Sequence, residues 1–283
     1  MELWYALVDL LPFEWAQPGH MYFMKNALLA VLVISPLFGI LSTMVVQSRM
    51  SFFSDALGHS AFTGMAIGSI AGLFAEPLWC AVLFAILFAL LFTFVRRRTS
   101  LASDTVIGVF SSTAVALGIF IATLGGQSFT KFNALLIGDI LSVEPGKIGL
   151  LALILLVVVV LWACSFNHLM LSAVHPALAD SRGIRVFWQE ALFSVAIAVV
   201  VTISMTWVGL LVINSLLVLP AAMARNVARN MRQYHLFSLL GAVAAGIGGL
   251  MMSYYIDASA GASITLCLAA LFLVTFFFRK QRQ

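Results

Sequence analysis

The sequence predicts an all-α protein, a polytopic bundle of about nine transmembrane helices, with about eight to ten as the range. Of the 283 residues, 63% are hydrophobic and only 9% are charged, whereas a soluble domain usually carries about a quarter charged residues. The mean hydropathy is +1.09. Apolar stretches of about twenty residues recur along nearly the whole chain, and each is long enough to cross a hydrocarbon core of about 30 Å. We therefore expect a single transmembrane domain over residues 1–283.

The expected crossings follow one another along the chain. The apolar runs cover residues 26–46, 51–73, 78–95, 103–124, 148–165, 187–206, 208–222, 235–255 and 259–278. Connections rich in arginine alternate with connections that are poor in it. The basic connections contain Arg49, Arg96–Arg98, Arg182 and Arg185, Arg225 to Arg232, and Arg279, Lys280 and Arg282. Basic residues gather in cytoplasmic connections, so we expect the N-terminus outside the cytoplasm and the C-terminus inside it.

Two segments do not fit this series of crossings. Residues 1–25 are expected to form an extracytoplasmic N-terminal segment, and because no Lys or Arg precedes Lys25 they lack the basic start of a signal peptide. Residues 131–145 are too short and too polar at their ends to span. We expect them to form a re-entrant or half-helical element, which is tolerated where it is buried against protein or lines a cavity.

The run 51–73 carries two ionisable residues four positions apart, Asp55 and His59. On a helix they share one face, and a charge in hydrocarbon costs from a few to more than ten kcal/mol, so such residues usually have a function. A carboxylate and an imidazole are ligands for zinc and other divalent first-row metals. A hydrogen-bonded pair that only ties two helices together is the alternative. On the opposite side, three glycines allow a neighbouring helix to approach closely: Gly64, Gly68 and Gly72.

A second notable stretch follows the run 208–222. Proline lacks the N–H that a helix interior needs, so we expect Pro220 to break the spanning helix. A short cytoplasmic helix over residues 220–232 would then dock on a partner protein through its basic residues. The alternative is an ordinary basic loop. The arginines concerned are Arg225, Arg229 and Arg232.

Several chemistries have no motif in this chain. The sequence has no phosphate-binding loop of the G-x-x-x-x-G-K-[ST] type, so the chain is not expected to hydrolyse ATP itself. It also lacks an H-E-x-x-H motif and a serine nucleophile motif. The basic residues lie in short clusters between apolar runs, which gives no indication of nucleic-acid binding.

Five blocks of the sequence resemble, in the same order, those of a known family: "RMSFFSDALGHSAFTGMAIG", "LASDTVIGVFSSTAVALGI", "LLIGDILSVEP", "VGLLVINSLLVLPAAMARNVAR" and "DASAGASITLCLAALF". The family is the membrane permease of bacterial ABC importers for zinc, manganese and iron. The resemblance covers about residues 26–278. One departure is Met223, which stands where the family usually has a threonine.

The resemblance implies a multi-pass permease of the bacterial cytoplasmic (inner) membrane that forms a two-fold homodimer. It also implies two copies of a separate ATP-binding subunit and an extracytoplasmic binding protein that delivers the metal. The family's intramembrane metal residues fall on Asp55 and His59, and its ATPase-coupling element falls on about residues 220–232. No permanently bound cofactor is implied, only a transported ion, with zinc favoured and manganese second.

Other polar residues carry weaker expectations. Asp139 either lines the ion pathway or caps a half-helix, and Asp257 is expected at the outer mouth. His168, His175 and His235 are expected to be solvated near cytoplasmic ends, and His20 has no assigned role. Two other functions remain open on these residues: a secondary transporter that uses Asp55 and His59 as a proton relay, and a membrane-embedded metal hydrolase.

Overall fold

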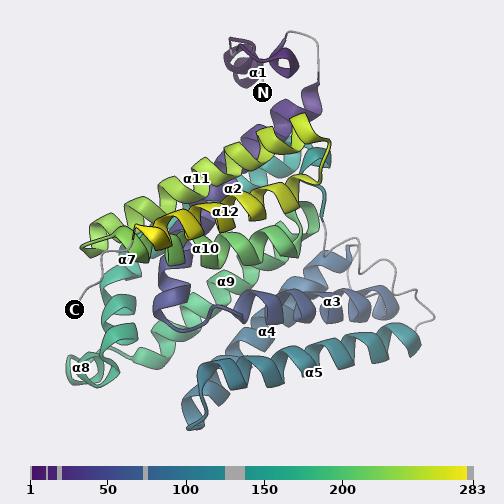
Figure 1. Cartoon of the computed structure of the whole chain (residues 1–283). Coiled ribbons are helices and arrows are strands. Elements are labelled where there is room, and N and C mark those ends of the chain that lie inside the picture. Colours follow the sequence, from purple (N-terminus) through teal and green to yellow (C-terminus); the bar gives the residue numbers. More distant parts are fainter. Residues whose placement is uncertain (1, 11, 18–20, 73–75, 125–137, 279–283) are drawn as a thin grey trace.

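The computed structural model describes residues 2–10, 12–17, 21–72, 76–124 and 138–278. Every regular element in these ranges is a helix, so the predicted all-α fold is confirmed (Figure 1). The helices form two groups. Helices α3, α4 and α5 pack together on one side, and α2, α10, α11 and α12 pack together on the other. Helix α9 contacts both groups, through α4 and through α10.

Eight of the described helices are long and apolar enough to cross a membrane, by length and composition. They are α2 (Tyr22–Gln47), α4 (Pro77–Arg98), α5 (Ser103–Leu124), α7 (Pro145–Val174), α9 (Val186–Val208), α10 (Leu210–Val227), α11 (Met231–Ile256) and α12 (Ala260–Phe277). Helix α3 (Phe53–Ala71) has 19 residues, which is a spanning length, but polar residues and glycines make it less apolar. Counting α3, the bundle has about nine spans, as predicted.

Four short elements complete the described part: α1 (Glu2–Val8), η1 (Glu14–Ala16), η2 (Ile140–Ser142) and α8 (Pro176–Ser181). The N-terminal segment folds onto the start of α2, where the fully buried Lys25 pairs with Asp9. The indole Nε1 of Trp4 donates to the backbone carbonyl oxygen of Lys25 at 3.0 Å. Within the predicted re-entrant stretch, residues 131–137 lie outside the described residues, and the rest contains η2 and the start of α7.

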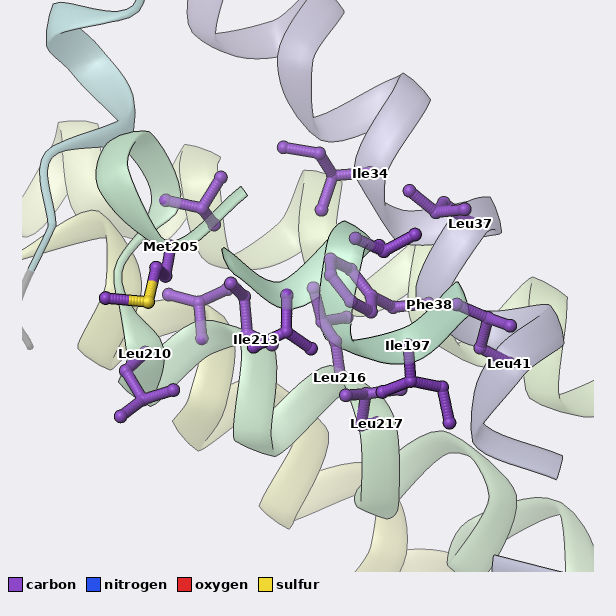
Figure 2. Packing of buried hydrophobic residues seen from close by; sticks show 14 of the residues in the cluster. Ile34, Leu37, Phe38, Leu41, Ile197, Met205, Leu210, Ile213, Leu216 and Leu217 are labelled. Atoms are coloured by element: carbon purple, nitrogen blue, oxygen red, sulfur yellow. The ribbon is translucent and has the colours of Figure 1, made fainter. Parts of the chain in front are cut away.

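One apolar core runs through most of the described helices. Figure 2 shows side chains of α2, α9 and α10 meeting there, and each of the labelled ones is at most 2% exposed. The labelled residues are Ile34, Leu37, Phe38, Leu41, Ile197, Met205, Leu210, Ile213, Leu216 and Leu217. This packing fixes α10 at the middle of the bundle, where it meets α2, α11 and α12.

Helix α10 does not end at Pro220, so the expected break there is wrong. The helix runs through the proline to Val227. Proline removes one helical hydrogen bond, but neighbouring helices can make this tolerable in a membrane protein. Here Pro220 is buried, and Ala221 and Ala224 after it form an apolar cluster with Tyr234 of α11. Packing against neighbouring helices therefore allows α10 to continue through Pro220.

Two of the three predicted glycine contacts are confirmed. A Cβ atom on Gly64 would lie 2.6 Å from the backbone Cα of Ala81 in α4, and one on Gly68 would lie 2.7 Å from the Cβ of Cys80. Gly72 acts differently: it ends α3 in the left-handed conformation, with φ of 59°, and a Cβ atom there would meet nothing within 4 Å.

Gly64→Ala is expected to destabilise the protein, because its methyl group would collide with the backbone of α4 and push two helices apart. Overpacking of this kind typically costs about 1–3 kcal/mol. Gly108→Ala in α5 is the matched control, since a Cβ there meets nothing within 4 Å. Thermal unfolding in detergent should show a lower Tm for Gly64→Ala than for Gly108→Ala. Equal Tm values would contradict the close α3–α4 contact.

Candidate functional site

The Asp55 and His59 side chains lie on one face of α3. The Nε2 atom of His59 is 3.5 Å from Oδ2 of Asp55. The Asp55 side chain is 44% exposed on the isolated chain, whereas that of His59 is 19% exposed. Two ligands that each lie about 2.1 Å from one tetrahedral ion are about 3.4 Å apart. The observed separation therefore matches the distance between two ligands of a common ion.

Helix α10 adds a third polar group that sequence reasoning missed. The Nδ2 amide of Asn214 donates a hydrogen bond of 3.2 Å to Oδ1 of Asp55. The two helices come close at Gly58, where a Cβ atom would lie 2.4 Å from the Leu210 side chain. The signal in the sequence was a single amide inside the apolar run "LLVINSLLVLP". Its partner lies 159 positions away in the chain, so no local pattern could reveal the contact.

One chain does not supply a complete metal cage in its described part. No group of three or more His, Cys, Asp or Glu residues that could hold an ion occurs among the described residues. The site on α3 and α10 offers one carboxylate, one imidazole and one amide. Structural zinc sites usually have four protein ligands, so a single copy of this site falls short of such a set.

The two other candidate carboxylates lie apart from this site. Asp139 is exposed and caps η2, because its Oδ1 accepts a hydrogen bond of 3.0 Å from the backbone N–H of Leu141. Asp257 is exposed at the end of α11, in the left-handed conformation with φ of 53°. No hydrogen bond or ion pair within the described ranges joins either carboxylate to Asp55.

The stretch 220–232 consists of the end of α10, a short turn and the start of α11. Asn230 caps α11 by accepting a hydrogen bond of 2.9 Å from the N–H of Gln233. The Gln233 side chain in turn accepts one of 2.9 Å from the N–H of Arg229. Arg225, Arg229 and Arg232 are all exposed. A groove of about 320 Å³ beside them is lined by Gln47, Arg225, Ala228, Arg229, Asn230, Met231 and Tyr234.

Met223 has a packing role in this region. It is 6% exposed, and a Cβ atom on Gly241 of α11 would lie 2.0 Å from the Met223 terminal methyl group. The side chain thus occupies the space that Gly241 leaves open. A thioether at this position fills the contact between α10 and α11, and the position provides no hydroxyl group.

The expectation that His235 is solvated is wrong. Its Nδ1 lies 2.8 Å from Oγ1 of Thr43 in α2, and its ring centroid lies 5.4 Å from that of Trp162 and 5.1 Å from that of Phe166 in α7. His235 lies in the second turn of α11, on the side that faces α2 and α7. His168 and His175 are exposed on the isolated chain, and His20 lies outside the described residues.

The fold and sequence are similar to those of known proteins along almost the whole chain. The model of the family described as "ABC 3 transport family" matches residues 20–279. The manganese import system permease protein ScaB of Streptococcus gordonii is 31% identical over 95% of this chain and 96% of its own. The high-affinity zinc uptake system membrane protein ZnuB of Haemophilus influenzae is 29% identical over 90% of this chain and 97% of its own.

Solved structures give the same picture. A chain in the structure of PsaBC from Streptococcus pneumoniae in complex with Fab superposes with a TM-score of 0.78 and 27% identity, covering 99% of this chain and 97% of that one. An inward-facing conformation of a putative metal-chelate type ABC transporter has a TM-score of 0.68 at 15% identity, covering 89% of this chain and 85% of that one. The second similarity is one of fold.

Proposed function

The chain belongs to the ABC 3 transport family, and on that basis we propose that it moves a divalent transition-metal ion, manganese or zinc, across the cytoplasmic membrane. It is the membrane transport subunit of an ABC transporter, and ATP hydrolysis is carried out by a separate subunit. The observation that carries the metal proposal is the Asp55–His59 pair, with its 3.5 Å separation, on a helix that has no other ionisable residue. Family membership favours ATP-driven transport over the proton-relay and hydrolase alternatives.

Both metals have support. Imidazole ligation suits zinc, whereas oxygen-rich sites suit manganese, and the site holds one imidazole and two oxygen-bearing side chains. ScaB is named as the permease protein of a manganese import system and ZnuB as the membrane protein of a zinc uptake system. We therefore propose Mn²⁺ or Zn²⁺ as the transported ion. The site has to bind this ion weakly enough for it to leave again.

We further propose that two copies of the chain form the pathway around a two-fold axis. The Asp55 side chain is 44% exposed on the isolated chain, which is unfavourable for a carboxylate in a membrane unless it faces protein or water. A second copy would add a second carboxylate and a second imidazole, giving four ligands of the kinds that zinc and manganese accept. An extracytoplasmic binding protein would deliver the ion to this pathway.

The exposed arginines of 220–232 are the proposed contact with the ATPase, of which two copies would serve the dimer. They lie at the end of α10, in the short connection and at the start of α11, and two of them, Arg225 and Arg229, line a groove of about 320 Å³. The groove lies at the junction of α10 and α11, so the same helix that carries Asn214 also ends at the proposed contact. Changes in the ATPase would thus reach the ion site along α10.

Uptake into proteoliposomes tests the proposed function. Vesicles that contain this chain and its ATPase subunit, with ATP inside and the binding protein outside, should accumulate Mn²⁺ or Zn²⁺ from the medium. Uptake should stop when ATP is omitted or replaced by a non-hydrolysable analogue. Uptake that persists without ATP and follows an imposed pH gradient would instead support the proton-relay alternative.

The proposed orientation gives a separate expectation. In a variant without native cysteines, a cysteine at Arg98 should react with a membrane-impermeant maleimide only after cells are permeabilised. One at Asp257 should react in intact cells. Both residues are exposed at helix ends, so access to the reagent depends on the side of the membrane. Labelling at position 98 in intact cells would contradict the proposed orientation.

A further inference from the structure

Asn214 has one satisfied group and one unsatisfied group. Its Nδ2 donates to Oδ1 of Asp55 at 3.2 Å. Its Oδ1 is buried and has no hydrogen-bond partner in the part of the chain that the structure describes. Buried polar atoms are nearly always hydrogen-bonded, and each exception needs an explanation. An unpartnered acceptor oxygen on a residue that is hydrogen-bonded to the Asp55 carboxylate suggests a cation as the missing partner.

The orientation of this amide is set by chemistry. An ionised carboxylate only accepts hydrogen bonds, whereas an amide donates from nitrogen and accepts at oxygen. The nitrogen of Asn214 must therefore face Asp55, because the reverse orientation would bring two acceptor oxygens together. As a result, the Asn214 oxygen is directed away from Oδ1 of Asp55 and remains available for another group.

We propose that Asn214 is a third ion-binding residue and sets the preference for the metal. Its N–H holds the Asp55 carboxylate, and its Oδ1 is offered to the ion alongside Oδ2 of Asp55 and Nε2 of His59. This inference rests on the proposed function. Carbonyl and carboxylate oxygens suit manganese, whereas zinc binds well to imidazole and needs few ligands. Asn214 should therefore contribute more to manganese binding than to zinc binding.

The neighbouring residue is a suitable control. The Ser215 hydroxyl donates to the carbonyl oxygen of Leu211 at 2.7 Å and lies 2.9 Å from Oγ1 of Thr265 in α12. It is adjacent to Asn214 in the chain but faces a different helix. Ser215→Ala thus removes a polar group of α10 without touching the ion site.

Equilibrium binding of the metals alone tests the inference. The permease is purified with its ATPase subunit, dialysed against Mn²⁺ or Zn²⁺, and its bound metal is measured by elemental mass spectrometry. Asn214→Leu should weaken Mn²⁺ binding at least about tenfold and Zn²⁺ binding no more than about threefold. Asn214→Asp should bind Mn²⁺ more tightly than the wild type but transport it with a lower maximal rate, because added charge slows release. Ser215→Ala should change neither.

Two results would overturn the inference while leaving the proposed function standing. One is wild-type Mn²⁺ affinity in Asn214→Leu. The other is an equal loss of Mn²⁺ and Zn²⁺ binding, which would assign Asn214 a structural role only. A wild-type complex that binds neither ion would overturn the proposed function and this inference together.

Discussion

Asp55→Asn and His59→Ala should each abolish metal uptake, with unchanged Tm and unchanged association with the ATPase subunit. Asp55→Asn keeps the shape of the side chain but removes the charge that offsets the lost hydration of the ion. His59→Ala removes the imidazole, whose Nε2 lies 3.5 Å from the Asp55 carboxylate. The double variant should be no worse than either single one, because groups that act on one ion are not additive.

The matched control for this prediction is Asp104→Asn. Asp104 is an exposed carboxylate in the first turn of α5, so its charge can be removed without altering the site on α3. The measurement combines uptake into proteoliposomes with thermal unfolding of the same purified variants. A purely structural pair would give the opposite pattern: each single variant would leave its partner side chain unpaired and destabilise the fold, by about 1–3 kcal/mol where that partner is buried. Variants with a lower Tm that still carry metal would rule out the ion site.

Reversing two charges at the junction of α10 and α11 should uncouple ATP hydrolysis from transport. Arg225→Glu combined with Arg229→Glu replaces two exposed cations beside the groove with two anions. A surface change of this kind usually alters folding stability by no more than about 0.5 kcal/mol. A large effect on ATPase association or on uptake would therefore come from the lost contact with the partner subunit. We expect reduced co-purification of the ATPase subunit and loss of ATP-dependent uptake, with an unchanged Tm.

Arg182→Glu provides the comparison, because Arg182 is exposed at the end of α8 and lies outside the groove. It should leave association and uptake close to the wild-type values. If the double reversal also leaves both unchanged, residues 220–232 form an ordinary basic connection, and the ATPase must bind elsewhere on the chain.

Most of the bundle could be predicted from the sequence, because membrane spans are determined by local composition. Runs of apolar residues must form helices in lipid, where each backbone polar group needs an internal partner. The spacing of Asp55 and His59 likewise fixes their common face. The glycine contacts of α3 with α4 followed from the same periodicity, except at Gly72, which ends the helix with positive φ.

Features that depend on contacts between distant segments could not be predicted. In the sequence, Asn214 is an isolated amide in an apolar run, and its contact with Asp55 becomes visible only when α10 packs against α3. Pro220 predicts the end of a helix from sequence alone. In the structure α10 continues through it, because the neighbouring residues pack against Tyr234. From the sequence, His235 is expected to be solvated because it lies near a basic connection. In the structure it contacts Thr43 of α2 and aromatic rings of α7.

The proline in α10 also affects how that helix can transmit force. Asn214 and Arg225 are eleven residues apart on one helix, or about 16 Å along its axis. Pro220 lies between them and leaves the carbonyl of Leu216 without its helical N–H partner. If a partner binds the arginine-bearing end, as proposed above, the missing hydrogen bond at Pro220 would let α10 bend there. A displacement of that end would then reach Asn214 partly as a tilt of the first half of the helix.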